Sequence, residues 1–469
     1  MTRSLPLTGT TDSGVERRPQ PIWGGITYHR EVLERIRVHV PNGAFLAVLA
    51  AGVVLERWVN YLWFEQAVVW GQPANVITMF LVAGLAFLVW LLAAPERMAS
   101  GWLMAFLAAM AGAWFIHWLL YRYHGDAMNY TAILYVPILI LIALKPPNAI
   151  GVRLAVLTFA WATAIVLVTT RVLEMLGLVE IKPQSPGVIT FDEERYFLPL
   201  NDLLGIDGRW PGPFGHNGDT AMMAALLVVI AIAFWSRSSW VFLVVGGLTL
   251  VLTNGRASIG AAAAGVVILV MFSRNPRLAR LPRALRIIGG SVVLVAGALV
   301  MFARPAGLTG REKIWPAFLE LWSQSPLLGV GGAGIANGNE VAQFYGHAHS
   351  LYIDELARWG LAGFVTQFAA IGIGVYIAAR AAGFGFPGPL AVIVTYLITG
   401  VTEPRNDWIA PSATGFLLIL MVLAAASYLQ ERGSARRLSN NLTSDQDASL
   451  TSTTGGDSRP GEASAPSRG

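Results

Sequence analysis

The chain has no cysteine and carries little charge. Without cysteine, disulfide bonds and thiol chemistry are excluded. Charged residues make up 13% of the chain, which is about half of their usual share in a soluble domain. Lysine occurs only at positions 145, 182 and 313, so arginine supplies nearly all of the basic residues behind the net charge of +5. In so apolar a chain, this basic excess indicates membrane topology and not nucleic-acid binding.

Apolar residues make up 55% of the chain. They occur in blocks of about twenty residues, long enough to cross a hydrocarbon core of ~30 Å as helices. Strands of a membrane barrel would alternate apolar with polar residues, and these blocks do not. The sequence therefore predicts an all-α integral membrane protein with about twelve transmembrane helices. The predicted spans are 43–63, 74–94, 101–121, 129–144, 152–171, 219–235, 239–253, 257–272, 287–303, 361–379, 389–401 and 411–429.

The charges of the loops predict the orientation in the cytoplasmic membrane. Arginines gather near the N-terminus, in the loop 273–286 and after the last span, and the predicted spans place all three on one side. The positive-inside rule makes that side the cytoplasm, so both termini are expected there. The loops 172–218 and 304–360 are then extracytoplasmic. The predicted domains are a cytoplasmic segment 1–42, a multi-pass membrane domain 43–430 and a cytoplasmic tail 431–469, which its polar, Ser- and Thr-rich composition predicts to be disordered.

Two of the seven histidines, His347 and His349, stand near the end of the outer loop 304–360, in the stretch GHAHSLYIDELARWG. Ser350 is the predicted N-cap of the helix that follows, and Gly360 is its predicted end. His349 would then lie just before a helix N-terminus, where free backbone amides and the helix dipole favour an anion.

The same loop contains REKIWPAFLELWSQ, in which Trp315, Phe318, Leu319 and Trp322 recur at helical spacing. Tryptophan favours the boundary between membrane and water. This stretch therefore predicts an amphipathic helix lying on the outer membrane surface.

Three arginines accompany the histidines in the predicted outer loops. Arg256 lies in the turn TNGR, Arg311 opens the amphipathic stretch, and Arg209 lies near His216 in a glycine-rich segment. Guanidinium groups match phosphate oxygens and stay charged at any working pH. A histidine beside them is disfavoured as imidazolium, and a neutral ring can act as a general base. Each arginine could instead be a snorkelling anchor or a partner of a nearby glutamate.

Four stretches in the region 205–365 resemble, in order, the sequence elements of the O-antigen ligase and polymerase superfamily. HSLYIDELARWGLAG is similar to that family's histidine motif, in which His-Asn, His-Ser or His-Gln is followed by nine residues and glycine. TGREKIWPAFLELWSQSPLLGVGGAG resembles its Gly-Arg, tryptophan and Pro-Leu-Leu-Gly-x-Gly block. NGRASIGAAAAG looks like its Ser-Arg-Gly-Ala element, with a departure before Arg256. RWPGPFGHNG resembles its Arg…Gly…Asn segment.

The resemblance implies a fold like that of the C-type glycosyltransferases and a metal-independent glycosyl transfer without a cofactor. Glycan would leave a polyprenyl (undecaprenyl) diphosphate carrier and join a hydroxyl of a glycan, lipid or cell-wall acceptor outside the membrane. His349 would be the catalytic base, and Arg256, Arg311 and Arg209 would bind the diphosphate. Secondary candidates for the site are His347, His216, Glu403 and Arg405.

Three alternatives stay open at the level of sequence. A polymerase that extends lipid-linked repeat units would need the same fold and the same site. A twelve-span transporter would place its ionisable residues near the bilayer midplane. A zinc site could use His347, His349 and Asp354, but no third histidine or cysteine stands at ligand spacing, so no metal is predicted.

Overall fold

Helices form on the predicted apolar blocks. A computed structural model describes residues 42–59, 71–93, 99–126, 135–179, 210, 212–214, 217–272, 292, 311–402 and 413–454. All regular secondary structure in these residues is helical. A helix lies on each predicted span except 287–303, which falls outside the described residues apart from Val292.

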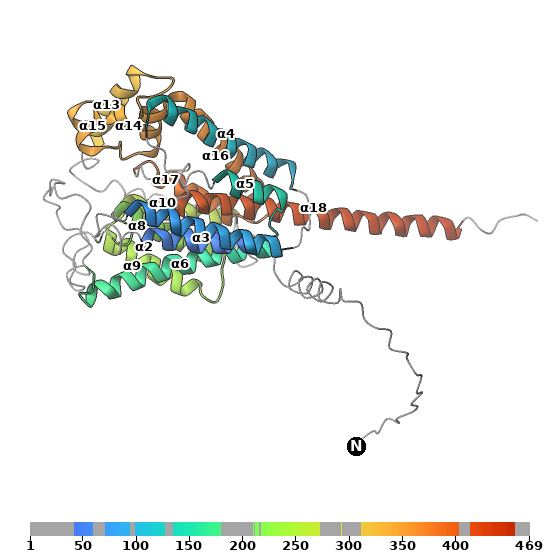
Figure 1. Cartoon of the computed structure of the whole chain (residues 1–469). Helices are drawn as coiled ribbons and strands as arrows, with labels where there is room; N and C mark the ends of the chain where they lie inside the picture. Colours follow the sequence, from blue (N-terminus) through green and yellow to red (C-terminus); the bar gives the residue numbers. More distant parts are fainter. Residues whose placement is uncertain are drawn as a thin grey trace, which may run out of the picture.

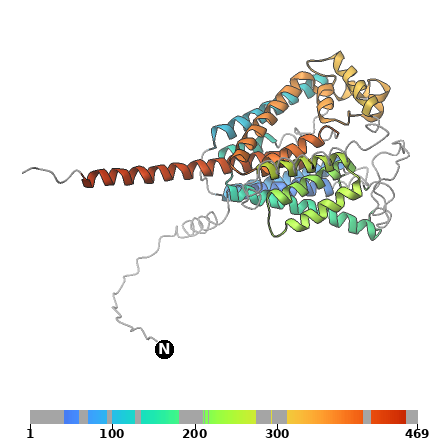
Figure 2. The ribbon, with the colours of Figure 1, turned by 180° about the vertical axis from the view of Figure 1, so that it is seen from behind.

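The helices form a main bundle, a tilted pair and a small cap (Figures 1 and 2). In the bundle, α2 packs on α3 and α6, α8 packs on α9, and α10 and α17 pack on each other and on α8. Helix α18 contacts both the bundle and the tilted pair α4–α16, beside which α5 lies. The bundle consists of α2 (Ala44–Val59), α3 (Gly71–Leu92), α6 (Ala149–Met175), α8 (Asn217–Ala233), α9 (Ser239–Thr253), α10 (Arg256–Phe272), α17 (Gly388–Thr399) and α18 (Ala413–Thr454). The other helices are α4 (Gly101–His124), α5 (Tyr135–Leu144), α16 (Leu351–Gly383) and, in the cap, α13 (Arg311–Gln324), α14 (Gly331–Ala336) and α15 (Glu340–Tyr345).

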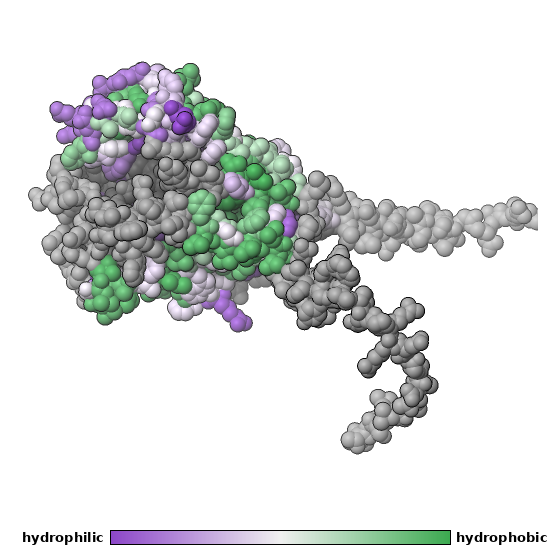
Figure 3. All heavy atoms as spheres, in the orientation of Figure 1, coloured by the Kyte–Doolittle hydropathy of each residue, from purple (hydrophilic) through white to green (hydrophobic). Residues whose placement is uncertain are grey.

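On the face seen in Figure 3, apolar residues gather on the described helices below the cap, and polar residues gather on the cap. Within the described residues, four helices are long and apolar enough to cross a membrane: α4, α6, α16 and the part of α18 up to Ser434. Large apolar side chains project outward from α3, α4 and α6, where water would make them costly. They include Phe80, Leu81, Leu85, Leu88, Trp102, Phe115, Leu154, Trp161 and Ile165. These features are those of a helical membrane protein.

The bundle has two ends, here called the cap end and the tail end. At the tail end, where α18 leaves the bundle, Phe234 after α8 meets Phe386 before α17, with ring centroids 5.9 Å apart. Because α17 starts there, its last residue, Thr399, lies at the opposite end, which the cap covers. The start of α8 lies at the cap end as well.

Helix α16 is broken by Gly360, which has φ +61° and ψ −165°. The amides of Leu361 and Ala362, set free by the break, donate to the carbonyls of Pro326 (2.9 Å) and Leu327 (3.0 Å). The glycine-rich turn after α13 therefore crosses α16 backbone to backbone. This crossing requires glycine, because a Cβ at Gly360 would overlap the carbonyl of Leu327.

The helix that starts after Ser350 ends at Gly360, as predicted, and a second helical stretch, which completes α16, follows directly. The freed amides at the start of this second stretch are satisfied by the crossing turn. At the other end of the chain, α18 continues past the predicted span 411–429 to Thr454. A helix that is already nucleated extends at low cost, since each added residue makes its own backbone hydrogen bond.

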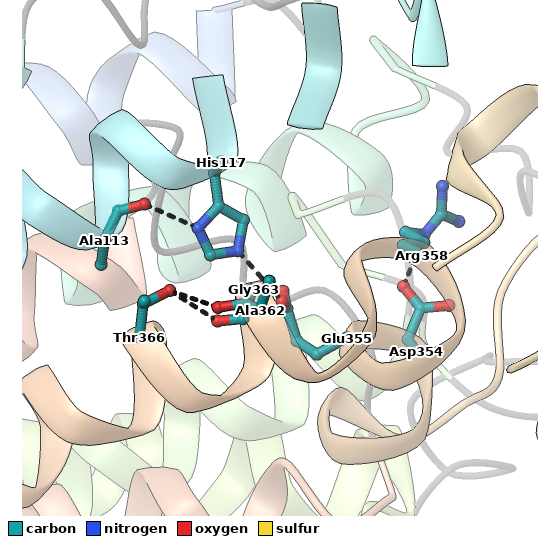
Figure 4. Close-up of polar contacts among 8 residues, drawn as sticks. All are labelled: Ala113, His117, Asp354, Glu355, Arg358, Ala362, Gly363 and Thr366. Carbon is teal, nitrogen blue, oxygen red and sulfur yellow. Dashed lines mark hydrogen bonds and ion pairs between the residues drawn. The ribbon is translucent and has the colours of Figure 1, made fainter. Parts of the chain in front are cut away.

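A buried ionisable pair joins α4 to α16 (Figure 4). Nε2 of His117 lies 3.3 Å from Oε2 of Glu355, and the two side chains are 0% and 6% exposed. Nδ1 of the same ring lies 2.8 Å from the carbonyl oxygen of Ala113. Trp359 packs edge-on against His117. Both polar side chains are thus buried with partners, as burial in an apolar environment demands.

We expect Glu355→Ala to lower the free energy of unfolding by about 3 kcal/mol, because it leaves His117 buried without this partner. A double variant, His117→Leu with Glu355→Leu, should recover most of that loss by replacing the pair with apolar contacts. Thermal unfolding of the purified protein in detergent measures both. Equal midpoints for wild type and Glu355→Ala would show that the pair contributes nothing to stability.

Candidate functional site

His349 lies at the cap end, in a tight turn between α15 and α16. Its φ of +48° is in the left-handed region, which few residues other than glycine adopt. Its ring lies edge-on to that of His347, with centroids 4.2 Å apart, and to that of Tyr345 at 5.7 Å. Both histidines are half-buried. Ser350 is the N-cap of α16, as predicted, but its side chain makes no capping hydrogen bond.

The turn after α17 fixes both His349 and Arg311. The amide of Leu351, two residues after His349, donates to the carbonyl of Gly400 at 2.7 Å. Nη2 of Arg311 donates to the carbonyl of Thr402 at 2.9 Å. One short turn thus holds Arg311 and Leu351, which are 40 positions apart in the sequence. Arg311 is half-buried, as the first residue of α13.

Arg256 lies at the same end of the bundle. It is the half-buried first residue of α10, after a turn in which Asn254 has φ +49°. A Cβ at Gly255 would overlap that of Ala221, so this turn packs closely on the start of α8. Since α8 begins at the cap end, the structure brings Arg256 to the end that also holds His349 and Arg311.

Trp210, the residue after Arg209, is hydrogen-bonded to the end of α9, close to the turn that precedes Arg256. The amide of Trp210 donates to the carbonyl of Leu252 at 3.0 Å, and its indole Nε1 donates to Oε2 of Glu174 at 2.7 Å. Glu174 also pairs with Arg171 at 3.2 Å. The end of α6 and the end of α9 therefore fix the position of Trp210.

Four of the predicted site residues lie outside the described residues: Arg209, His216, Glu403 and Arg405. The described part of the chain contains no group of three or more His, Asp or Glu side chains close enough to hold a metal ion.

The end of α4 contributes contacts that the sequence analysis did not single out. Asp126 accepts the amides of Gly332 (2.7 Å) and Ala333 (3.1 Å), and Nε2 of His124 lies 3.0 Å from the carbonyl oxygen of Leu328. These contacts hold the glycine-rich turn against α4. The sequence did show polar residues at the end of an otherwise apolar span, which indicates that they have partners. It could not show which partners, because these lie about 200 residues further along the chain.

The fold and the gathered residues define a helical membrane protein with basic and histidine side chains at one end. Residues 222–368 match the family model described as O-antigen ligase, and this segment carries the turns of Arg256, Arg311 and His349. The match covers the segment in which the motifs resemble those of the O-antigen ligase superfamily, as predicted. No curated protein matches the chain.

Proposed function

We propose that the protein is a glycosyltransferase that moves a preassembled glycan from a polyprenyl diphosphate carrier to an acceptor hydroxyl at the outer face of the cytoplasmic membrane. The observation that carries this proposal is the hydrogen bonding of the His349 turn and of Arg311 to one short turn at Gly400–Thr402. The base acts on the acceptor hydroxyl and the cation acts on the leaving diphosphate, on opposite sides of one anomeric carbon, so the two groups must be held near each other.

The chemistry follows from these groups. His349 takes the proton of the acceptor hydroxyl, whose oxygen attacks the anomeric carbon of the donor sugar. The bond from that carbon to the diphosphate oxygen breaks, and the lipid diphosphate leaves with the negative charge. Arg256 and Arg311 stabilise this charge through guanidinium hydrogen bonds. The residues that hold the diphosphate are arginines, so the proposed reaction is metal-independent.

The proposed arrangement in the membrane is about twelve spans, related to C-type glycosyltransferases, with both termini in the cytoplasm. The apolar sides and the polar cap support this orientation of the long axis across the bilayer. The cap, with the site beneath it, then faces away from the cytosol.

The absence of native cysteine makes this topology directly testable. A single cysteine introduced as Glu340→Cys, at an exposed position in the cap, should react with a membrane-impermeant maleimide in cells whose outer envelope is permeabilised. One introduced as Ser434→Cys, exposed at the tail end, should react only after the cytoplasmic membrane is opened. The reverse pattern of labelling would contradict the proposed orientation.

Reconstitution tests the activity. Purified protein in liposomes, supplied with a labelled lipid-linked oligosaccharide and a separate acceptor, should transfer label to the acceptor without added metal. A ladder of longer glycans on the carrier itself would identify a polymerase. Carrier that crosses the membrane with its glycan unchanged would identify a transporter.

A further inference from the structure

The turn that carries His349 is tied to α16 by two side chains for which the mechanism above has no role. Oδ1 of Asp354 accepts the amide of Ala348 at 3.0 Å. Nη2 of Arg358 donates to the carbonyl of Gly346 at 2.6 Å. The two side chains also bind each other, with Arg358 Nε donating to Asp354 Oδ2 at 2.7 Å. Together they form a clamp across the turn.

The backbone of the turn needs such support. His349 adopts a left-handed conformation that costs free energy for a side chain with a Cβ, and such residues persist only where their surroundings fix them. Asp354 binds the amide of Ala348, directly before His349, and Arg358 binds the carbonyl of Gly346, three residues before it. Both contacts hold the backbone that leads into His349.

Helix stability alone does not account for this pair. An Asp–Arg pair one helical turn apart adds only a small amount to the stability of a helix. Here each partner uses one atom for the pair and a second atom for the turn, and the side chains are 13% and 26% exposed. The neighbouring Glu355 points to His117 on α4, while Asp354 points to Arg358 (Figure 4). Adjacent carboxylates thus anchor α16 on one side and hold the histidine turn on the other.

We propose that Asp354 and Arg358 are positioning residues for glycosyl transfer, which hold the ring of His349 in line with the acceptor hydroxyl. This inference rests on the proposed role of His349 as the base. The clamp acts through His349 and does not touch the donor, so its loss should lower the rate of chemistry and leave donor binding intact.

Two substitutions open the clamp without removing much volume. Asp354→Asn keeps an oxygen for the amide of Ala348 but presents an NH2 group to Arg358, donor against donor. Arg358→Lys keeps the charge, but one ammonium group cannot replace the guanidinium fork that reaches both Asp354 and Gly346. The exposed Glu340, in the same cap, provides the matched acid-to-amide control, Glu340→Gln.

The variants are compared in the liposome assay with a labelled lipid-linked oligosaccharide. Asp354→Asn and Arg358→Lys should lower kcat on the order of 10- to 100-fold, as expected for a misplaced catalytic group. KM for the donor should change by less than about threefold. Glu340→Gln should behave as wild type. In a His349→Asn background, Asp354→Asn should cause no further loss, because a residue that acts through His349 has no effect without it.

Several results would overturn the inference. One such result is that Asp354→Asn and Arg358→Lys have the same kcat as wild type. Another is that Asp354→Asn lowers kcat by the same factor whether residue 349 is histidine or asparagine. If Asp354→Asn no longer yields folded protein by size-exclusion chromatography, the clamp serves folding and not positioning. Full activity of His349→Asn alone would instead refute the proposed function, whatever the clamp variants do.

Discussion

His349→Asn should reduce glycan transfer by about 10²- to 10⁴-fold, the usual contribution of a general base. Asparagine is the suitable replacement because it tolerates the left-handed backbone of this position, with φ +48°. Its amide cannot take up a proton near neutral pH. The turn should therefore keep its shape while the chemistry is lost. The measurement is the initial rate of label transfer from a lipid-linked oligosaccharide in liposomes, with the yield of folded protein determined alongside.

His347→Asn is the matched control in the same turn. The two rings are in edge-on contact, with centroids 4.2 Å apart, so each change removes the same ring contact. We expect the loss for His347→Asn to stay within about tenfold, because it removes packing of the base and not the base itself. A larger loss for His347→Asn than for His349→Asn would assign the proton transfer to the other ring. Wild-type rates for both would remove the histidine turn from the mechanism.

The effect of His349→Asn on donor binding separates the roles of the proposed site residues. Arg256 and Arg311 are proposed to bind the diphosphate, whereas His349 is proposed to act on the acceptor. The substitution His349→Asn should therefore leave KM for the donor nearly unchanged. The hydrogen bond of Leu351 to Gly400, which fixes the start of α16, involves only backbone atoms and survives the substitution.

The positions of the helices could be predicted from the sequence because hydropathy is a local property. The apolar composition of a block such as 152–171 is enough to predict a helix there, and α6 covers it, at Ala149–Met175. The resemblance to the O-antigen ligase superfamily could be predicted too, because motifs are local stretches of sequence in a fixed order. It is confirmed for residues 222–368, which match that family's model.

What joins these elements could not be predicted. The contact between His117 and Glu355 spans 238 positions, and that between Asp126 and Gly332 spans 206. Each depends on which face of α4 meets α16, which a pattern of nearly uniform apolar residues does not specify. The ion pair of Asp354 and Arg358 could have been predicted, because a spacing of four residues on a helix places an acidic and a basic side chain together. Its second contacts, to the backbone of the histidine turn, required the structure.

The crossing at Gly360 links two separate stretches of this sequence, the glycine block after α13 and the glycine ten residues after Ser350. The nine residues between Ser350 and Gly360 are the length of α16 from the histidine turn to its break. At the break, the chain from Pro326 to Gly329 passes so close that neither Gly329 nor Gly360 has room for a Cβ. The two motifs are therefore two sides of one backbone contact, and that contact sets the position of the histidine turn.

Gly360→Ala should consequently be among the most damaging single changes in the chain. A methyl group there would overlap the carbonyl of Leu327, and φ +61° with ψ −165° is a conformation essentially restricted to glycine. We expect a loss of about 3–5 kcal/mol in the free energy of unfolding, through this strain and the broken crossing.

Gly372→Ala, in the same helix, is the matched control. A Cβ at Gly372 would meet nothing within 4 Å, and its backbone is helical. That change should therefore be neutral or raise stability by up to about 1 kcal/mol. Thermal unfolding in detergent, followed by size-exclusion chromatography, compares the two variants. Glycan transfer by the folded fraction of Gly360→Ala should fall as well, because one helical stretch of α16 connects the histidine turn to the break. Similar unfolding midpoints for the two alanine variants would show that the crossing of α16 is not as close as described.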